Sequence, residues 1–160
     1  MAIGPVQPLF AQLGHFNKVT LTCAAEAARY YRVPELLLDS ILEQEGGQVG
    51  QAVRNRNGSY DLGPAQINTS WLHRFARFGI SAAPIMDDPC TNLYAAAYVL
   101  RLDVNHFGGR DWFRATMAYN VGVHGWADPT RYRIAYYYAY AVVRRWWGLY
   151  DTVERRRAAR

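Results

Sequence analysis

Residues 36–68 read LLLDSILEQEGGQVGQAVRNRNGSYDLGPAQIN, and this stretch decides the fold. Its apolar residues recur at helical spacing after Pro34, a residue suited to a first helical turn. These features predict a helix over 34–45 that Gly46-Gly47 ends. The following segment, 46–63, is polar and rich in Gly and Asn. Because Asn57-Gly58 is a strong turn signal, we expect a loop or short hairpin there.

Helical periodicity dominates the flanking sequence, with strand content minor or absent. The further predicted helices cover 20–31, 64–78, 89–107, 111–120 and 130–150. A length of 160 residues fits one core, and a hydrophobic content of 51% argues against disorder. The expected fold is therefore mainly α, a single domain of about six helices. We expect an N-terminal extension over 1–19, the domain over 20–150 and a basic, solvated tail over 151–160.

Composition excludes several classes of function. No apolar run reaches the length of a membrane-spanning helix. The net charge of +5 is mild and not grouped along one face, so no nucleic-acid partner is expected, whereas an anionic polymer would suit it. The four histidines are scattered without ligand spacing, so we assign no metal and no cofactor. Residues 1–20 lack a signal peptide's pattern, which leaves either a cytosolic protein or a processed one.

Cys23 and Cys90 leave two interpretations open. They could be separate buried thiols. If bonded, they would close a loop of roughly 70 residues, worth on the order of 4 kcal/mol in the chain-entropy model.

Glu45 is the candidate acid. It follows Leu38, Ile41 and Leu42 on one helical face, whereas Glu43 lies about 200° away and should face solvent. Burial and the negative end of the helix dipole should both raise the pKa of Glu45, preparing it to donate a proton. The alternative is an ordinary exposed glutamate at a helix end.

Segment 57–68 supplies amides, a hydroxyl, a phenol and glycines within a dozen residues. Neutral hydrogen-bonding groups beside an aromatic face suit a sugar better than an ion. The plainer interpretation is a turn followed by the start of a helix.

At these residues the chain resembles the soluble-lytic-transglycosylase type of domain, above all its short members that accompany bacterial secretion and conjugation machineries. Four motifs match in order between about 23 and 142: a helix-ending Glu-Gly at 45–47, Gly-Pro-Ala-Gln at 63–66, Ala-Tyr-Asn at 118–120, and Tyr138 four residues before Val142. One departure is Ala65, where the family usually has methionine, so we expect one shortened apolar contact in the sugar site.

The resemblance implies a lysozyme-like fold whose polar loop lies beside an active-site groove. It also implies cleavage of the glycosidic bond between N-acetylmuramic acid and N-acetylglucosamine in peptidoglycan. Protonated Glu45 would donate to the glycosidic oxygen. It would then accept a proton from the muramoyl 6-hydroxyl, closing a 1,6-anhydro ring without water.

The same matching implies roles for other residues. Gln66 and Asn120 would bind acetamido groups, Tyr138 would orient Glu45, and Tyr119 would wall the groove. Tyr60 and Asp61 would line or brace the site. Core packing with an anchored hydroxyl is the alternative for Tyr119 and Tyr138.

The family's second cysteine resembles Cys90, which implies a Cys23–Cys90 disulfide and a periplasmic or secreted location. Peptidoglycan strands are the expected partner, with secretion or conjugation proteins as further candidates. Two rival functions stay open: a goose-lysozyme-like hydrolase that uses Asp61 with Glu45 to place a water, and a non-catalytic peptidoglycan-binding accessory protein.

Overall fold

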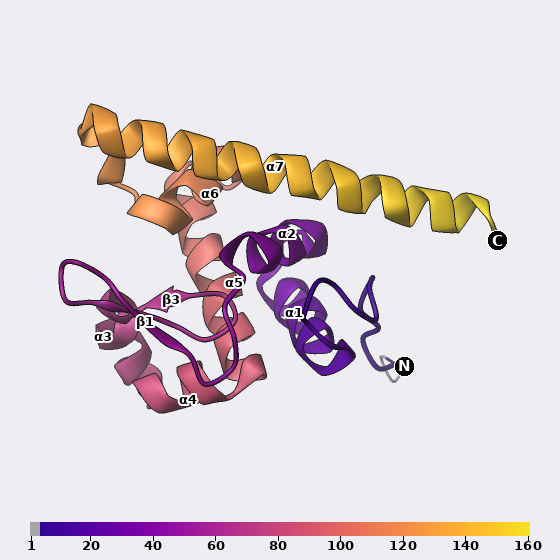
Figure 1. Cartoon of the computed structure of the whole chain (residues 1–160), viewed down its shortest axis with the longest axis horizontal. Helices are drawn as coiled ribbons and strands as arrows, with labels where there is room; N and C mark the ends of the chain where they lie inside the picture. Colours follow the sequence, from indigo (N-terminus) through magenta and orange to yellow (C-terminus); the bar gives the residue numbers. More distant parts are fainter. Residues whose placement is uncertain (1–3) are drawn as a thin grey trace.

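This computed structural model describes residues 4–160. They contain seven α-helices and one three-stranded sheet, joined by short 3-10 helices and loops (Figure 1). The α-helices are α1 (Lys18–Tyr31), α2 (Glu35–Glu45), α3 (Leu72–Phe75), α4 (Ala82–Asp87), α5 (Pro89–His106), α6 (Trp112–Val121) and α7 (Pro129–Ala158). The strands are β1 (Ala52–Arg54), β2 (Tyr60–Leu62) and β3 (Ile67–Asn68). Three short 3-10 helices are η1 (Thr69–Trp71), η2 (Ala76–Phe78) and η3 (Gly125–Ala127). The mainly α architecture with a small hairpin is as predicted.

The core forms where α1 packs against α5. Both helices present alanines at this contact, and small side chains let the two backbones approach closely. The buried residues include Ala24, Ala27 and Ala28 on α1 and Ala96, Ala97 and Leu100 on α5. The disulfide between Cys23 and Cys90 joins the same two helices, with Cα atoms 4.8 Å apart. It ties the chain's first helix to the start of its central one.

Helix α2 carries the predicted acid to the edge of this core. Leu38, Ile41 and Leu42 are fully buried, which confirms the apolar face predicted from their spacing. The helix ends where Gly46 adopts a left-handed conformation, φ 62°, and its amide donates to Leu42 O. Glycine takes this conformation without steric cost, so the predicted stop after Glu45 has a local cause.

The expected helix over 64–78 is wrong in its first part. Gly63 and Gln66 both have positive φ, 66° and 52°, which an α-helix excludes. Ile67 instead pairs with Leu62 in the sheet, and helical structure begins only at Thr69. Proline at position 64 therefore opens a tight turn rather than a helix. The helix α4 lies in a segment that we expected to be a loop.

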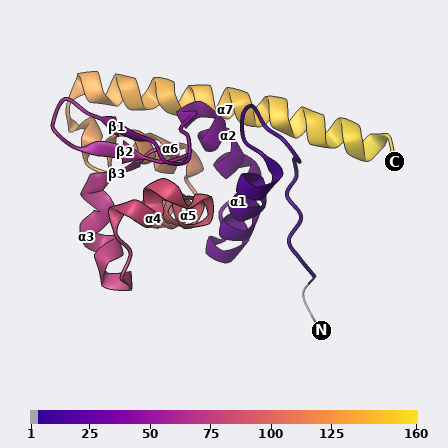
Figure 2. The same cartoon turned by 60° about the horizontal axis from the view of Figure 1, so that its bottom comes forward.

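Helix α7 extends beyond its predicted end at 150 and continues to Ala158. It lies along one side of the molecule in both views (Figures 1 and 2). Its buried residues Ala135, Ala139, Val142 and Leu149 face the domain, and most of its other side chains are exposed. Within residues 4–160, no helix combines the length and apolar content needed to cross a bilayer.

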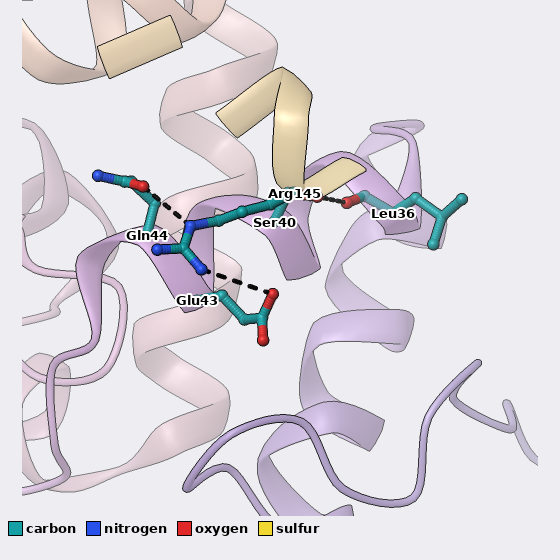
Figure 3. A network of polar contacts seen from close by, with 5 residues as sticks. All are labelled: Leu36, Ser40, Glu43, Gln44 and Arg145. Atoms are coloured by element: carbon teal, nitrogen blue, oxygen red, sulfur yellow. Dashed lines mark hydrogen bonds and ion pairs between the residues drawn. The ribbon is translucent and has the colours of Figure 1, made fainter. Parts of the chain in front are cut away.

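Arg145 fastens α7 to α2. Its Nε donates to Oε1 of Gln44 at 2.9 Å, and its Nη1 lies 4.0 Å from Oε2 of Glu43 (Figure 3). Glu43 is thus half-buried against α7 and does not face solvent as the helical spacing suggested. The prediction failed because a helix packs over this face.

The segment before α1 also belongs to the core. Phe10, Leu13 and Phe16 are buried, and the amide of Leu9 donates to the carboxylate of Glu35 at 2.7 Å. Arg156, near the end of α7, lies over the Phe10 ring. The N-terminal segment therefore packs against α2, and the last turns of α7 contact that segment.

Candidate active site

An open groove of about 1010 Å³ separates the sheet from α6 and the start of α7. One wall comes from the β1–β2 loop, β2, β3 and η1. The other comes from the end of α6 and the first turns of α7. The lining residues are Glu45, Asn55, Arg56, Asn57, Ser59, Asp61, Gln66, Ile67, Asn68, Ser70, Trp71, Val99, Ala118, Tyr119, Asn120, Val121, Gly122, Arg131 and Ile134.

Glu45 contributes a carboxyl group to this groove. Burial raises its pKa to about 7, and the nearby Asp61 charge adds to the increase. The hydroxyl of Tyr138 opposes this shift by donating a 2.5 Å hydrogen bond to Oε1. Burial also raises the pKa of Tyr138 well above its ordinary value, so its hydroxyl stays protonated and remains a donor. Glu45 is therefore poised to exchange a proton near neutral pH.

Asp61 projects into the groove from β2. Its Oδ1 accepts a hydrogen bond from Nδ2 of Asn68 at 2.8 Å, and the same amide donates to Ser59 Oγ at 3.0 Å. Asn68 thus links Asp61 to Ser59 in the sheet wall. These contacts orient Asp61 beside Glu45 without an ion pair.

Gln66 reaches the groove because the turn before it packs against the residues after Glu45. A Cβ at Gly47 would collide with Gly63 O and come within 2.5 Å of Nε2 of Gln66. The Gly47 amide donates to Pro64 O at 3.2 Å, and Nε2 of Gln66 donates to Gly63 O at 2.8 Å. Only glycine at 47 permits this approach, which explains physically why Glu-Gly-Gly and Gly-Pro-Ala-Gln occur together.

Asn92 holds the same turn from below and was missed by the sequence analysis. Its Nδ2 donates to Leu62 O and Ile85 O at 2.8 and 2.9 Å, and its Oδ1 accepts from the Ala65 amide at 2.8 Å. The residue is completely buried, so these bonds satisfy groups that water cannot reach. Its only sequence signal was an asparagine on the apolar face of the helix predicted over 89–107.

Helix α6 brings Tyr119 and Asn120 to the opposite wall. The Tyr119 hydroxyl donates to Ala65 O at 2.8 Å, so it anchors the turn to α6 while the residue lines the groove. Asn120 is exposed at the end of α6. Both parts of the predicted Ala-Tyr-Asn motif therefore border the same groove as Glu45.

Two other predicted positions differ from expectation. Tyr60 is exposed on β2 and is not among the groove-lining residues. Ala65 is fully buried within the turn, so the expected shortened contact in the sugar site does not lie on the groove surface. Trp71 supplies an aromatic group to the groove wall instead. It was overlooked because it lay within the helix predicted over 64–78.

His15 reaches the site from the N-terminal segment. Its Nε2 lies 2.9 Å from Gly47 O. Because a carbonyl oxygen only accepts hydrogen bonds, this ring nitrogen carries the hydrogen. The backbone after Glu45 is thus held from both sides, by His15 and by the turn around Pro64. Across residues 4–160, no three His, Cys, Asp or Glu side chains gather closely enough to hold a metal ion.

Residues 22–141 match the family described as Transglycosylase SLT domain. The chain belongs to this family. It is 33% identical over 120 residues to Invasion protein IagB of Salmonella typhimurium, a match that covers 74% of each chain. It is 30% identical over 115 residues to the X polypeptide of Escherichia coli, covering 71% of this chain and 67% of that one. Membership in the transglycosylase SLT domain family implies a peptidoglycan substrate and a location outside the cytoplasm, which a disulfide suits.

Proposed function

We propose that this protein is a peptidoglycan lytic transglycosylase that cleaves the N-acetylmuramic acid–β-1,4–N-acetylglucosamine bond and leaves 1,6-anhydro ends. The observation that carries the proposal is the state of Glu45. It lies in an open groove, has a pKa raised to about 7, and is oriented by Tyr138. A carboxyl group with this pKa can serve as acid and then as base at neutral pH.

The hydrogen bond from Tyr138 distinguishes the two oxygens of Glu45. Oε1 accepts the phenolic hydrogen, so the carboxyl proton belongs on Oε2. Oε2 donates this proton to the glycosidic oxygen as the bond from that oxygen to the anomeric carbon breaks. The substrate's acetamido oxygen stabilises the developing positive charge. The Glu45 carboxylate then removes the proton of the muramoyl 6-hydroxyl, whose oxygen bonds to the anomeric carbon, and the acid is regenerated.

Gln66 and Asn120 are proposed to bind the acetamido groups of the substrate. Nε2 of Gln66 is engaged by Gly63 O, which leaves the side-chain carbonyl free to accept from a sugar N–H. Asn120 offers both donor and acceptor from the facing wall. Tyr119 contributes the wall itself, and Tyr60, from the far side of β2, would contact only a longer glycan.

A hydrolase is the second candidate because Asp61 borders the same groove as Glu45. In that mechanism Asp61 would help to place a water that attacks the anomeric carbon. The reaction would leave reducing ends instead of anhydro ends.

Digestion of purified cell wall, followed by mass spectrometry of the soluble muropeptides, tests the proposal. We expect anhydro products from the wild type, none from Glu45→Gln, and retained anhydro products from Asp61→Asn. Reducing ends that disappear with Asp61→Asn would establish the hydrolase instead. Wall clearing by neither the wild type nor Glu45→Gln would favour a non-catalytic binding protein.

We also propose a periplasmic or secreted location and a role in local wall opening for a secretion or conjugation machinery. The disulfide and the likeness to an invasion protein support this setting. Co-purification of the native protein with a membrane-spanning secretion complex, lost on deletion of that complex, would test it.

A further inference from the structure

Two arginines line the groove from opposite walls. Arg56 lies in the β1–β2 loop, and Arg131 lies in the first turn of α7. Both residues are exposed. Within residues 4–160 neither is near enough to a carboxylate to form an ion pair, since the ion pairs found there involve Arg114, Arg145 and Arg157. The groove therefore contains two positive charges that no carboxylate of residues 4–160 neutralises.

The guanidinium of Arg131 is held in place before any ligand arrives. Its Nη2 donates to Val121 O at 2.9 Å, which fixes the side chain across the turn between α6 and α7. A guanidinium carries five N–H donors, so most of them stay available to the groove. Arg131 precedes Tyr138 by two helical turns, or roughly 10 Å along α7.

Arg56 is presented by a loop that is bonded to itself. The Asn55 amide donates to Ser59 O at 2.8 Å, and the Ser59 hydroxyl donates to Oδ1 of Asn57 at 2.7 Å. The polar groups on either side of Arg56 are thus hydrogen-bonded within the loop. The Arg56 guanidinium is therefore the group of this loop best able to bind a charged ligand.

Charge is distributed unequally along the groove. Its acids, Glu45 and Asp61, come from the end of α2 and from β2, whereas the arginines come from the loop tip and the start of α7. A guanidinium fork matches the two oxygens of a carboxylate, and a held side chain loses less entropy on binding. We infer that Arg56 and Arg131 bind carboxylates of the glycan strand, so that the groove selects an anionic glycan over a neutral one with the same backbone.

This inference rests on the proposed function, which supplies the glycan. The carboxylate is that of the stem peptide or, on a muramoyl residue without a stem, that of the lactyl group. The two sources share one chemistry and differ after amidase treatment, which removes the stem and frees the lactyl carboxylate.

Binding to the full-length Glu45→Gln protein tests the inference without turnover. The probes are a muramoyl tetrasaccharide with stems, the same tetrasaccharide after amidase treatment, and neutral chitotetraose. Arg56→Gln and Arg131→Gln should each weaken binding of an anionic probe about three- to tenfold and leave chitotetraose within about twofold. Arg54→Gln and Arg133→Gln, exposed neighbours outside the groove lining, are the matched controls and should change neither.

Loss confined to the stem-bearing probe assigns the stem carboxylate, and loss confined to the amidase-treated probe assigns the freed lactyl carboxylate. Loss with both anionic probes shows that the arginines bind either carboxylate. Equal loss for chitotetraose, or no loss for any probe, overturns the inference. Arg131→Lys controls for misfolding, because it keeps the positive charge and a donor for Val121 O. It should retain part of the preference for the anionic probes over chitotetraose. The digest with wild-type protein tests the proposed function separately, since it depends on products and not on this preference.

Discussion

The phenol of Tyr138 donates a 2.5 Å hydrogen bond to Oε1 of Glu45, although 93 positions separate the two residues in the chain. The acid belongs to the second helix and its positioning group to the last. This contact makes the orientation of Glu45 depend on how α7 docks against α2.

Removing that hydroxyl should alter the pH dependence as well as the rate. The Tyr138 bond lowers the pKa of Glu45, so Tyr138→Phe should raise that pKa and move the alkaline limb of kcat/KM to higher pH. The wild-type limb should fall above about pH 7, where the acid loses its proton. We expect kcat to fall roughly ten- to hundredfold because the acid is less well oriented. Tyr140→Phe, an exposed change on the same helix, is the control, and an unmoved limb would contradict the assignment.

The Asp61 charge affects the pKa of Glu45 in the opposite direction to the Tyr138 hydrogen bond. It raises the pKa of Glu45, so Asp61→Asn should lower that pKa and move the alkaline limb toward acid pH. The amide can keep a hydrogen bond with Asn68 through its carbonyl, which limits structural change. Rates measured from pH 5 to 9 would check this. A limb that shifts upward would refute the electrostatic argument.

Gly47→Ala should damage both stability and activity. The added methyl group would meet Gly63 O and the Gln66 side chain, separating the turn from the residues after Glu45. We expect a loss of about 1–3 kcal/mol in the free energy of unfolding and a strong loss of wall clearing. Gly148→Ala offers a matched control, because its added Cβ would meet no atom of the described chain within 4 Å beyond the local backbone of α7. This helix should gain up to about 1 kcal/mol. Equal Tm changes in the two variants would disprove the packing argument.

The disulfide should account for a large part of the stability. It closes a chain segment with a separation of 67 residues, for which the chain-entropy model gives about 4 kcal/mol. The double variant Cys23→Ala/Cys90→Ala should therefore melt about 10 °C lower than the oxidised protein. Reductant should lower the Tm of the wild type by a similar amount and leave the double variant unchanged. A wild type insensitive to reductant would contradict this.

Asp39 should make stability depend on pH. Both of its carboxylate oxygens are buried and have no hydrogen-bond partner among residues 4–160. Burial raises its pKa well above the ordinary value, with Glu35 and Glu43 adding to the shift. The folded pKa of Asp39 is raised above its unfolded value, which is about 4. Its contribution to the free energy of unfolding is therefore fully present below about pH 4 and is lost as the pH rises through the folded pKa. Asp39→Asn removes this loss and should raise Tm at pH 8 by at least about 3 °C, with little change at pH 4. Asp151→Asn, on the exposed surface of α7, is the control. A gain that is equal at both pH values would argue against ionisation as the cause.

Local patterns predicted the helices well where caps and periodicity agreed. The Asn17 and Asp88 side chains cap α1 and α5, and Gly46 ends α2, so those bounds follow from neighbouring residues. The segment after Pro64 failed because its conformation depends on distant partners. Asn92, 27 positions beyond Ala65, accepts the hydrogen bond that holds the turn.

The site was predictable to a similar extent. Spacing alone nominated Glu45, and the motifs brought Gln66, Tyr119 and Asn120 to the groove that it lines. The exposed position of Tyr60 could not be predicted from the sequence. It depends on which face of β2 turns toward the groove, and β2 pairs with β3 over only two residues. The arginines of the groove lie in a loop and at a helix start, where no periodicity distinguishes them from other surface charges.

The continuity of α7 has a practical meaning for dividing this protein into parts. The match to the family ends at residue 141, yet the helix runs unbroken from Pro129 to Ala158. A polypeptide cut at the end of the similarity would lose Val142 and Leu149, which are buried, together with the Arg145 contact to α2. Tyr138 would then stand within one turn of a fraying end. The end of the family match is therefore not the end of the unit that folds cooperatively.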